Sequence, residues 1–438
     1  MSILDLFLAF GLFLVGVVIC MVRDYALYMA LAFGFVCFFT VGLRRGFGPK
    51  ALLKMAWEGS KTSLVVLRIL VLVGVLTGLW RAGGTIVYFV ATGLRILTPA
   101  SFVLVAFLLS ALLSLAFGSC FGVSGTAGII LMTMARTGGA DLAMTAGAAL
   151  SGAFFGERLS PASSAAALVS AVSKADQGEF QRQQWRDTWV PLAATLAFYT
   201  VLSLRNPIPR VDMEMVELLE SSFQLNWITL LPAAVLLILP WFKVKAARAI
   251  LISCGFAALS ALFVQKMSLW EVLQVSILGY QEPNPALAQI LSGGGLISMK
   301  NSVLIVFLSC SYAGIFRGTG MLDRLKEQVC RLADRIGRMG AQIVVALGVS
   351  GVLCNQSVSI VMTQQIMEKY YEQEGISGQQ MARDIGNTVL NLAGTLPWCI
   401  ACSVCLANME ATPAAVPYAV YLYLLPLWAW WKFRVKKE

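Results

Sequence analysis

Long apolar runs separated by short polar connections make up most of the chain. Each run has roughly the 20 residues that a membrane span needs. The clearest runs are 4–22, 25–43, 63–80, 101–118, 189–204, 226–241, 249–264, 301–316 and 417–431, and further helical segments fill 129–172 and 341–409. The pattern predicts an all-α, polytopic integral membrane protein with roughly ten to twelve spans.

One apolar segment, 147–167, departs from this pattern. It contains Glu157, Arg158 and several serines, and Pro161 follows the charge pair. A charge inside a span is costly, and a proline within a helix breaks it. Membrane transporters build ion sites from broken helices, whose freed backbone groups face a polar cavity. We interpret the segment as an ion site with Pro161 as its hinge. The alternative is a loop at the membrane surface.

A second interruption lies at 118–128, where four glycines alternate with small and hydroxyl residues, among them Ser119 and Thr126. Glycine at this density weakens a helix. The segment is therefore expected to be a second discontinuous helix or a tight crossing of small residues.

Charge is scarce and is concentrated in the connections. Charged residues make up 13% of the chain, whereas soluble domains average about 25%. The net charge of +10 comes from basic residues in connections such as 44–61 and 317–338 and after 431. This distribution fits the excess of Lys and Arg on the cytoplasmic side of membrane proteins rather than nucleic-acid binding. It predicts a bacterial-type inner membrane protein with both termini in the cytoplasm.

Histidine is absent, which excludes a Ser-His-Asp or Cys-His catalytic arrangement and histidine-ligated metal. Cys399, Cys402 and Cys405 have the spacing of an iron–sulfur ligand run, but no fourth cysteine follows nearby. Small-residue helix packing is the preferred reading of these cysteines. We therefore expect no enzymatic activity, no cofactor and no metal beyond a transported Na⁺.

An internal repeat relates the two halves. The motif at Gly78–Gly84 resembles that at Gly314–Gly320, at an offset of 236 residues. Without a gap, the same offset carries Pro161 onto Pro397 and the segment 118–120 onto 354–356. By the charge pattern, the span 63–80 of the first copy starts in the cytoplasm, whereas the equivalent span 301–316 of the second copy ends there. Opposite directions of equivalent spans predict inverted-topology repeats around a central site. The expected divisions are 1–62 (first spans and basic connection), 63–175 (repeat A), 176–298 (connecting spans), 299–411 (repeat B) and 412–438 (last span and tail).

The second half has polar residues of its own. Asp384, Asn387, Asn391 and Thr395 recur at helical spacing ahead of Pro397 and Trp398. Asn355 and Gln356 occupy the other interruption. Carboxylate, amide and hydroxyl oxygens suit a hard cation such as Na⁺, and carboxylates also carry protons. The alternative for the polar stripe is hydrogen bonding between helices without transport.

The motif GAALSGAFFGERLSPAS resembles the signature of the NhaC family of Na⁺/H⁺ antiporters, as do Asn355-Gln356 and Leu396-Pro397-Trp398 in the second half. The resemblance implies inverted repeats with helical hairpins meeting at a central site. It places Glu157 at the family's acidic position, and Ser160, Pro161 and Ser163 at its Ser-Pro-x-Ser. Ser164 stands where the family commonly has an aspartate. This departure removes one carboxylate that could hold either Na⁺ or a proton.

These observations predict a secondary active transporter, most simply a Na⁺/H⁺ antiporter with a carboxylate-centred cation site. The alternative is an ion-coupled carrier of a small organic solute such as an amino acid, an organic acid or an organic cation, which Trp398 could contact through its ring face. The partners expected are the bilayer, Na⁺ and H⁺ or a small solute, and no nucleic acid; a homodimer is compatible with the sequence. The ion- or substrate-binding candidates are Glu157, Ser160, Ser163, Ser164, Ser119, Thr126, Asn355, Gln356, Asp384, Asn387, Asn391, Thr395 and Trp398.

Overall fold

The computed structural model describes residues 3–23, 25–61, 63–96, 99–207, 213–242, 244, 246–320 and 325–435. Within these ranges every regular element is helical, apart from an isolated bridge between Tyr280 and Gly293. The helices of the fold include α1 (Ile3–Val22), α2 (Leu27–Arg44), α5 (Thr85–Ile96), α8 (Ile129–Gly138), α12 (Met213–Ser222), α13 (Leu231–Ile238), α14 (Ala246–Leu259), α15 (Leu269–Leu278), α16 (Pro285–Leu291), α17 (Gly295–Ser298), α19 (Leu325–Ile336) and α24 (Tyr421–Val435).

The helices form the expected all-α polytopic membrane protein. Of the described residues, four helices are long and apolar enough to cross a membrane, or six if each of two bent pairs is one span. The bent pairs are Pro49–Lys61 with Val66–Ala82, at 50°, and Gly378–Thr395 with Ile400–Asn408, at 52°. Shorter apolar helices such as α6 (Phe102–Phe117) and α20 (Arg338–Leu353) supplement them. The total of ten to twelve spans stays a prediction, because breaks and bends divide the apolar segments.

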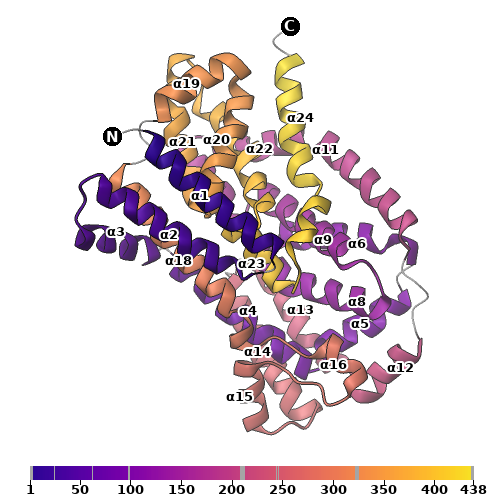
Figure 1. The fold of residues 1–438 in the computed structure, drawn as a ribbon. Helices are drawn as coiled ribbons and strands as arrows, with labels where there is room; N and C mark the ends of the chain where they lie inside the picture. The colour runs from indigo at the N-terminus through magenta and orange to yellow at the C-terminus, as the bar shows by residue number, and fades with distance from the viewer. Residues whose placement is uncertain are drawn as a thin grey trace.

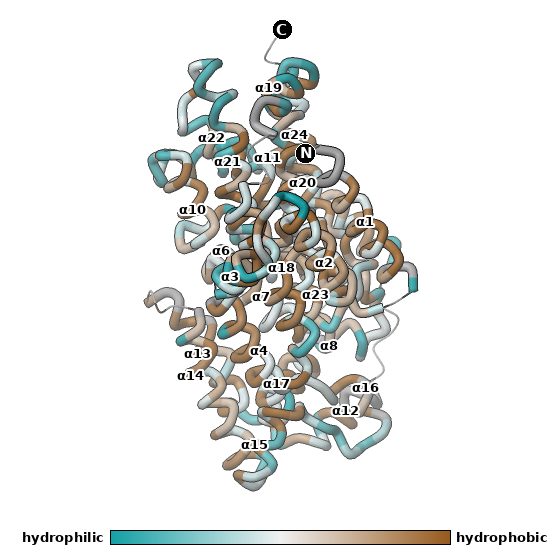
Figure 2. Tube along the Cα trace, turned by 60° about the vertical axis from the view of Figure 1, so that its left-hand side comes forward, coloured by the Kyte–Doolittle hydropathy of each residue, from teal (hydrophilic) through white to brown (hydrophobic). Residues whose placement is uncertain are grey.

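The start of α1, the helix α19 and the end of α24 all lie toward the upper part of the molecule in Figure 1. Hydrophobic positions predominate along the helices below, and hydrophilic positions gather around α19 and around α22 (Gly378–Leu392), as Figure 2 shows. The basic segments of α19 and α24 therefore lie at one end of the molecule, as one would expect if they faced the same side of a membrane.

The two halves repeat with the predicted offset, and the repeat reaches the ends of individual helices. In each of the following pairs, adding 236 to the bounds of the first element gives those of the second to within a residue: α4 (Leu64–Ala82) and α18 (Lys300–Thr319), α6 (Phe102–Phe117) and α20 (Arg338–Leu353), α10 (Ser164–Val172) and α23 (Ile400–Asn408). Likewise α9 (Leu142–Leu159) matches α22 (Gly378–Leu392) together with its 3₁₀ extension to Thr395. The sequence motifs thus mark a structural repeat.

Contacts between the halves are reciprocal, as in a two-fold arrangement. A Cβ on Gly59 would lie 2.6 Å from the Cα of Gly314, and a Cβ on Gly78 would lie 3.1 Å from the backbone nitrogen of Gly295. The offset of 236 residues relates Gly59 to Gly295 and Gly78 to Gly314, so the two contacts are equivalent under the repeat. Along the bent pair of α3 (Pro49–Lys61) and α4, the neighbours at α18 come from progressively earlier residues: Gly318 lies beside Met55, Gly314 beside Gly59, and Met299 beside Gly74. The bent pair therefore runs antiparallel to α18. Equivalent helices with opposite directions are what inverted repeats require.

The basic segment 44–61, expected to be a connection, is largely the helix α3 (Pro49–Lys61), which packs along α18. Its buried positions, Leu52, Ala56, Gly59 and Ser60, follow helical spacing. That spacing was present in the sequence, but the basic residues on the opposite face obscured it. α3 lies near the middle height of the molecule in both views (Figures 1 and 2).

Small residues bring α9 against α6. A Cβ on Gly152 would lie 2.8 Å from the backbone nitrogen of Ala111, and one on Gly156 would lie 2.6 Å from the carbonyl carbon of Ser114. The Ser114 hydroxyl also donates to the Ala153 carbonyl at 2.5 Å. Small residues four apart allow such close backbone approach in membrane proteins. This packing fixes the position of α9, which carries Glu157 and Arg158 near its end.

Candidate functional site

Two helices break at equivalent positions. After α6, Gly118 adopts a left-handed conformation (φ 66°), and Ser119 then caps α7 (Cys120–Val123) by accepting from the Gly122 N–H. After α20, Cys354 adopts the same conformation (φ 51°), and Asn355 caps α21 (Gln356–Gln373). The left-handed residue stops each helix, and the extended cap starts the next.

Glu157 lies between these two breaks. Its side chain comes from the last turns of α9, and the residue is only 6% exposed. Oε1 accepts from the Cys120 N–H at 3.3 Å, and Oε2 accepts from Nε2 of Gln356 at 3.5 Å. Gln356 also donates to the Leu390 carbonyl at 3.1 Å, which connects the carboxylate to α22. Two of the candidates singled out in the sequence, Glu157 and Gln356, therefore meet here, next to the break that Ser119 caps.

The serines after Glu157 serve mainly to shape the hairpin. α9 ends at Leu159, and Ser160 to Ser163 form the turn that contains Pro161. The Ser160 hydroxyl accepts from the Ala162 N–H, and Ser163 caps α10 by accepting from the Ala166 N–H, both at 3.2 Å. Ser164 is exposed. The break expected at Pro161 is present, but the hydroxyls bond to the adjacent backbone.

Most of the polar stripe of α22 lies in other contacts. Asp384 accepts from Tyr371 and Gln380 and pairs with Arg338. Asn391 donates to the Gly386 carbonyl at 3.3 Å, while its buried Oδ1 has no partner in the described structure. Thr395 bonds within its own turn. The stripe thus contributes to several interfaces rather than to one site.

Three further candidates form hydrogen bonds that do not involve Glu157. Thr126 donates to the Gly122 carbonyl at 2.7 Å within the π-helical turn Ser124–Gly128. Asn355 accepts from the Val358 N–H at 3.2 Å. Trp398, beside Pro397 in the turn between α22 and α23, donates to the Gly351 carbonyl at 2.9 Å and borders an apolar cavity. No contact joins Trp398 to Glu157 among the described residues.

Arg158 anchors a second polar cluster, on the other side of α9. It is fully buried, and its N–H groups meet five neutral acceptors: the carbonyls of Gly386 and Gln184, the hydroxyls of Thr188 and Tyr421, and Oδ1 of Asn387. A guanidinium has five N–H groups, so every donor is satisfied. The fold thus accommodates a buried charge without a direct carboxylate partner.

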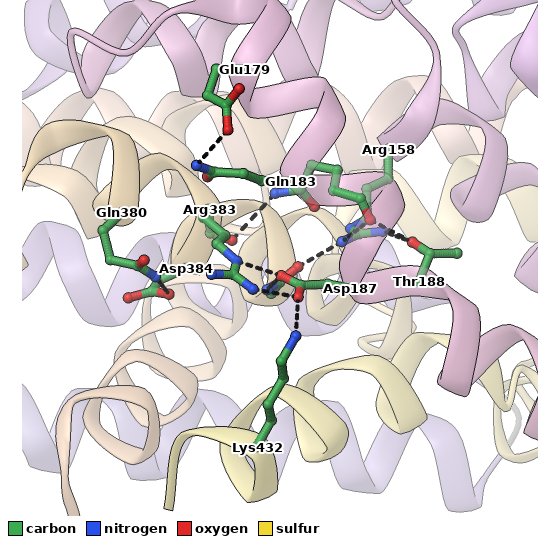
Figure 3. Close-up of polar contacts among 11 residues, drawn as sticks. Arg158, Glu179, Gln183, Asp187, Thr188, Gln380, Arg383, Asp384 and Lys432 are labelled. Atoms are coloured by element: carbon green, nitrogen blue, oxygen red, sulfur yellow. Dashed lines mark hydrogen bonds and ion pairs between the residues drawn. The ribbon is translucent and has the colours of Figure 1, made fainter. Parts of the chain in front are cut away.

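Through Asn387 this cluster reaches Asp187 on the long helix α11 (Gln177–Arg205). Arg383 donates two hydrogen bonds to the Asp187 carboxylate, from Nε at 2.6 Å and from Nη2 at 2.5 Å, and Nζ of Lys432 donates to it at 2.9 Å. Figure 3 shows Arg383 and Lys432 approaching Asp187 from different sides. Sequence reasoning noticed Arg158 but missed Asp187, because Asp187 lies in a polar stretch that looked like a connection. The capping Asp176 starts a helix there.

Comparison with known proteins defines the family. The model of the Na⁺/H⁺ antiporter family matches residues 3–205 and 210–428. The chain belongs to this family. A Na⁺/H⁺ antiporter NhaC of Alkalihalophilus pseudofirmus is 24% identical over 84% of the chain and 81% of its own length. A malate-2H⁺/Na⁺-lactate antiporter of Bacillus subtilis is 26% identical (91% and 86%), and an arginine/ornithine antiporter of Halobacterium salinarum is 29% identical (78% and 73%).

The expected resemblance to the NhaC family is therefore confirmed. The family consists of transporters rather than enzymes, and the apolar helices agree with a multi-pass membrane protein. Among the described residues, no group of three or more His, Cys, Asp or Glu side chains is arranged to hold a metal ion.

Proposed function

We propose that the chain is a secondary active antiporter that exchanges Na⁺ for H⁺ across a bacterial-type plasma membrane, with Glu157 as its cation-binding carboxylate. The observation that supports this most is the position of Glu157, a buried carboxylate between two symmetry-related helix breaks. Ion sites in transporters with inverted repeats lie where broken helices meet. Family membership supports the same activity.

The hydrogen bonds of Glu157 leave its oxygens available. Both contacts, at 3.3 and 3.5 Å, are longer than the usual 2.9–3.0 Å of an N–H to oxygen bond. Each carboxylate oxygen has two lone pairs, so each keeps the capacity to take a proton or to contact Na⁺. Proton and Na⁺ would then compete for one group, which is the requirement for exchange.

Gln356 is the natural partner in this exchange. Its amide offers a donor at Nε2 and an acceptor at Oε1. In the structure, Nε2 faces the carboxylate. When Na⁺ binds, a turn of the amide presents Oε1 to the cation. Ser160, Ser163 and Asn391 would complete the shell only if hairpin motion about Pro161 and Pro397 redirects them.

Exchange of a small organic solute, coupled to an ion, is the second candidate. Two relatives carry organic acids or amino acids according to their names. The local bonding of Ser160 and Ser163, together with the exposure of Ser164, leaves fewer ligands for a bare cation. We also propose that both termini lie in the cytoplasm, because the basic α19 and the end of α24 share one end of the molecule (Figure 1).

Transport by the purified protein in liposomes tests the first proposal. A Na⁺ pulse should drive proton movement, reported by a trapped pH-sensitive dye. Glu157→Gln should reduce this flux by at least roughly a hundredfold, because an amide cannot take up a proton at neutral pH. Glu58→Gln is the matched control, since Glu58 is a surface residue of α3 whose side chain is 55% exposed.

Normal flux in Glu157→Gln would refute the role of this residue. If the wild-type protein shows no Na⁺-driven proton flux but exchanges labelled malate, lactate, arginine or ornithine, the organic-solute alternative is correct. The same liposomes serve both assays, so the outcomes are directly comparable.

A further inference from the structure

A polar cavity of about 260 Å³ lies beside the Arg158 cluster, at the end of the molecule where α24 terminates. Its lining includes the basic side chains of Arg338, Arg383 and Lys432 and the carboxylates of Asp187 and Asp384. These residues come from α11, α20, α22 and α24. The cavity is separate from Glu157, whose carboxylate contacts the helix breaks instead.

Both carboxylates at this cavity already face several donors. Asp187 accepts four hydrogen bonds: two from Arg383, one from Lys432 and one from Asn387. Asp384 accepts from Tyr371 and Gln380 at 2.7 and 2.8 Å and lies 2.9 Å from Nε of Arg338. A cation entering the cavity would find few free oxygens and several positive charges. The site is therefore unsuited to Na⁺.

The basic side chains, in contrast, have donors to spare. Lys432 uses one of its three N–H groups on Asp187, and Arg383 uses Nε and Nη2. Nε of Arg338 faces Asp384, and neither Nη of Arg338 forms a hydrogen bond with any described residue. The Arg338 guanidinium lies 4.4 Å from the centre of the Phe433 ring, which holds it in place. The cavity thus offers several donors that have no acceptor of their own.

The charge balance points the same way. Arg158, Arg338, Arg383 and Lys432 face only Asp187 and Asp384 within this connected cluster, which leaves an excess of positive charge. Buried or half-buried charge without a partner is costly, and the cost falls when an opposite charge binds. The volume would hold several waters, at about 30 Å³ each, or one small anion.

We propose that this cavity is a binding site for a small oxyanion that carries a carboxylate or phosphate group. Arg338, Arg383 and Lys432 donate to the oxyanion, and Asp187 keeps the last two of these side chains in position. Because the site joins α22 of the second repeat to α11 and α24, an anion bound there stabilises this arrangement of the helices. The proposal does not depend on the cation chemistry of Glu157.

Thermal stability of the purified full-length protein in detergent tests the site. L-malate and inorganic phosphate are titrated separately at constant sodium concentration and ionic strength, with neutral malamide as the matched probe. A saturable rise in melting temperature with malate or phosphate, but not with malamide, supports the site, and the effective ion identifies the oxyanion. No saturable rise with either ion overturns it.

Variants then locate the binding. Lys432→Gln should raise the half-saturating concentration by roughly tenfold, since it removes one charge-assisted hydrogen bond. Arg434→Gln, on the exposed side of the same helix, should leave it unchanged. Asp187→Asn should lower it, because it releases donors of Arg383 and Lys432. Equal weakening by Lys432→Gln and Arg434→Gln would mean general surface charge and would refute the site.

Glu157→Gln separates this inference from the proposed antiport. It should bind the oxyanion as the wild-type protein does, even if it transports no cation. Loss of oxyanion stabilisation in Glu157→Gln would merge the two sites and contradict the proposal.

Discussion

The two repeats share one backbone but differ in where they carry charge. At the breaks, Gly118-Ser119 and Cys354-Asn355 adopt the same left-handed and extended conformations. On the hairpin helices, however, the positions equivalent to Glu157 and Arg158 are Ala393 and Gly394. The backbone that creates the breaks is symmetric, and the charges attached to it are not.

The asymmetry has a physical reason. Two copies of Glu157 beside the same pair of breaks would place like charges together in a medium of low dielectric constant. The second repeat supplies a neutral partner in its place, since Gln356 reaches Glu157 and Asn387 reaches Arg158. Repeated architecture therefore provides the geometry, and sequence divergence between the copies provides a single charged centre.

The largest effect that would test this comparison is expected at Arg158. Arg158→Met should destabilise the protein by roughly 3–5 kcal/mol, because five buried acceptors lose their donor. Its equivalent in the other repeat, Gly394, has no side chain and therefore makes no such hydrogen bonds. Apparent unfolding temperatures in detergent measure the effect, with Arg95→Met as control, since the side chain of Arg95 is 48% exposed. Wild-type stability of Arg158→Met would mean that the cluster does not hold the helices together.

The breaks allow a second test, between equivalent left-handed residues. Gly118→Ala should cost about 2–4 kcal/mol, from left-handed strain and from a Cβ placed 2.6 Å from the carbonyl carbon of Ala162. Cys354→Gly should change stability by less than about 1 kcal/mol, since relief of strain offsets the loss of the thiol. The same unfolding assay compares the two variants. If Cys354→Gly lost as much stability as Gly118→Ala, relief of strain would not offset the loss of the thiol at Cys354, and the two breaks would not be equivalent.

Much of this architecture was predictable from sequence, because it depends on local chemistry. Pro161 and Pro397 lie in turns that follow helices, Gly118 stands at a helix break, and the offset of 236 residues could be read directly. The other glycines of 118–128 lie within helical turns. The position of Glu157 between the breaks followed from combining the repeat with the charge. These features need only short segments of chain.

The contacts of side chains could not be predicted in the same way. Asp384 was grouped with the ion site, yet it pairs with Arg338 from another helix. Arg158 meets residues up to 263 positions away, and nothing in the local pattern selects these partners. Serines beside a carboxylate looked like ligands, but Ser163 caps a helix and Ser160 bonds within the turn. Hydroxyls satisfy nearby backbone N–H groups readily, so composition alone overstates the number of ligands.

The smallest effect concerns the reciprocal glycine contacts. Gly59→Ala and Gly78→Ala should each cost roughly 1–3 kcal/mol, because both introduce a methyl group against backbone of the other half. Backbone cannot turn aside as a side chain can, so the two costs should be similar. Gly255→Ala is the control: no heavy atom lies within 4 Å of its added Cβ, and it should stabilise α14 by about 1 kcal/mol. Unfolding temperatures of the three variants, measured side by side, decide the matter. A large loss of stability in Gly59→Ala with none in Gly78→Ala would mean that the two contacts, although related by the repeat, do not contribute equally to stability.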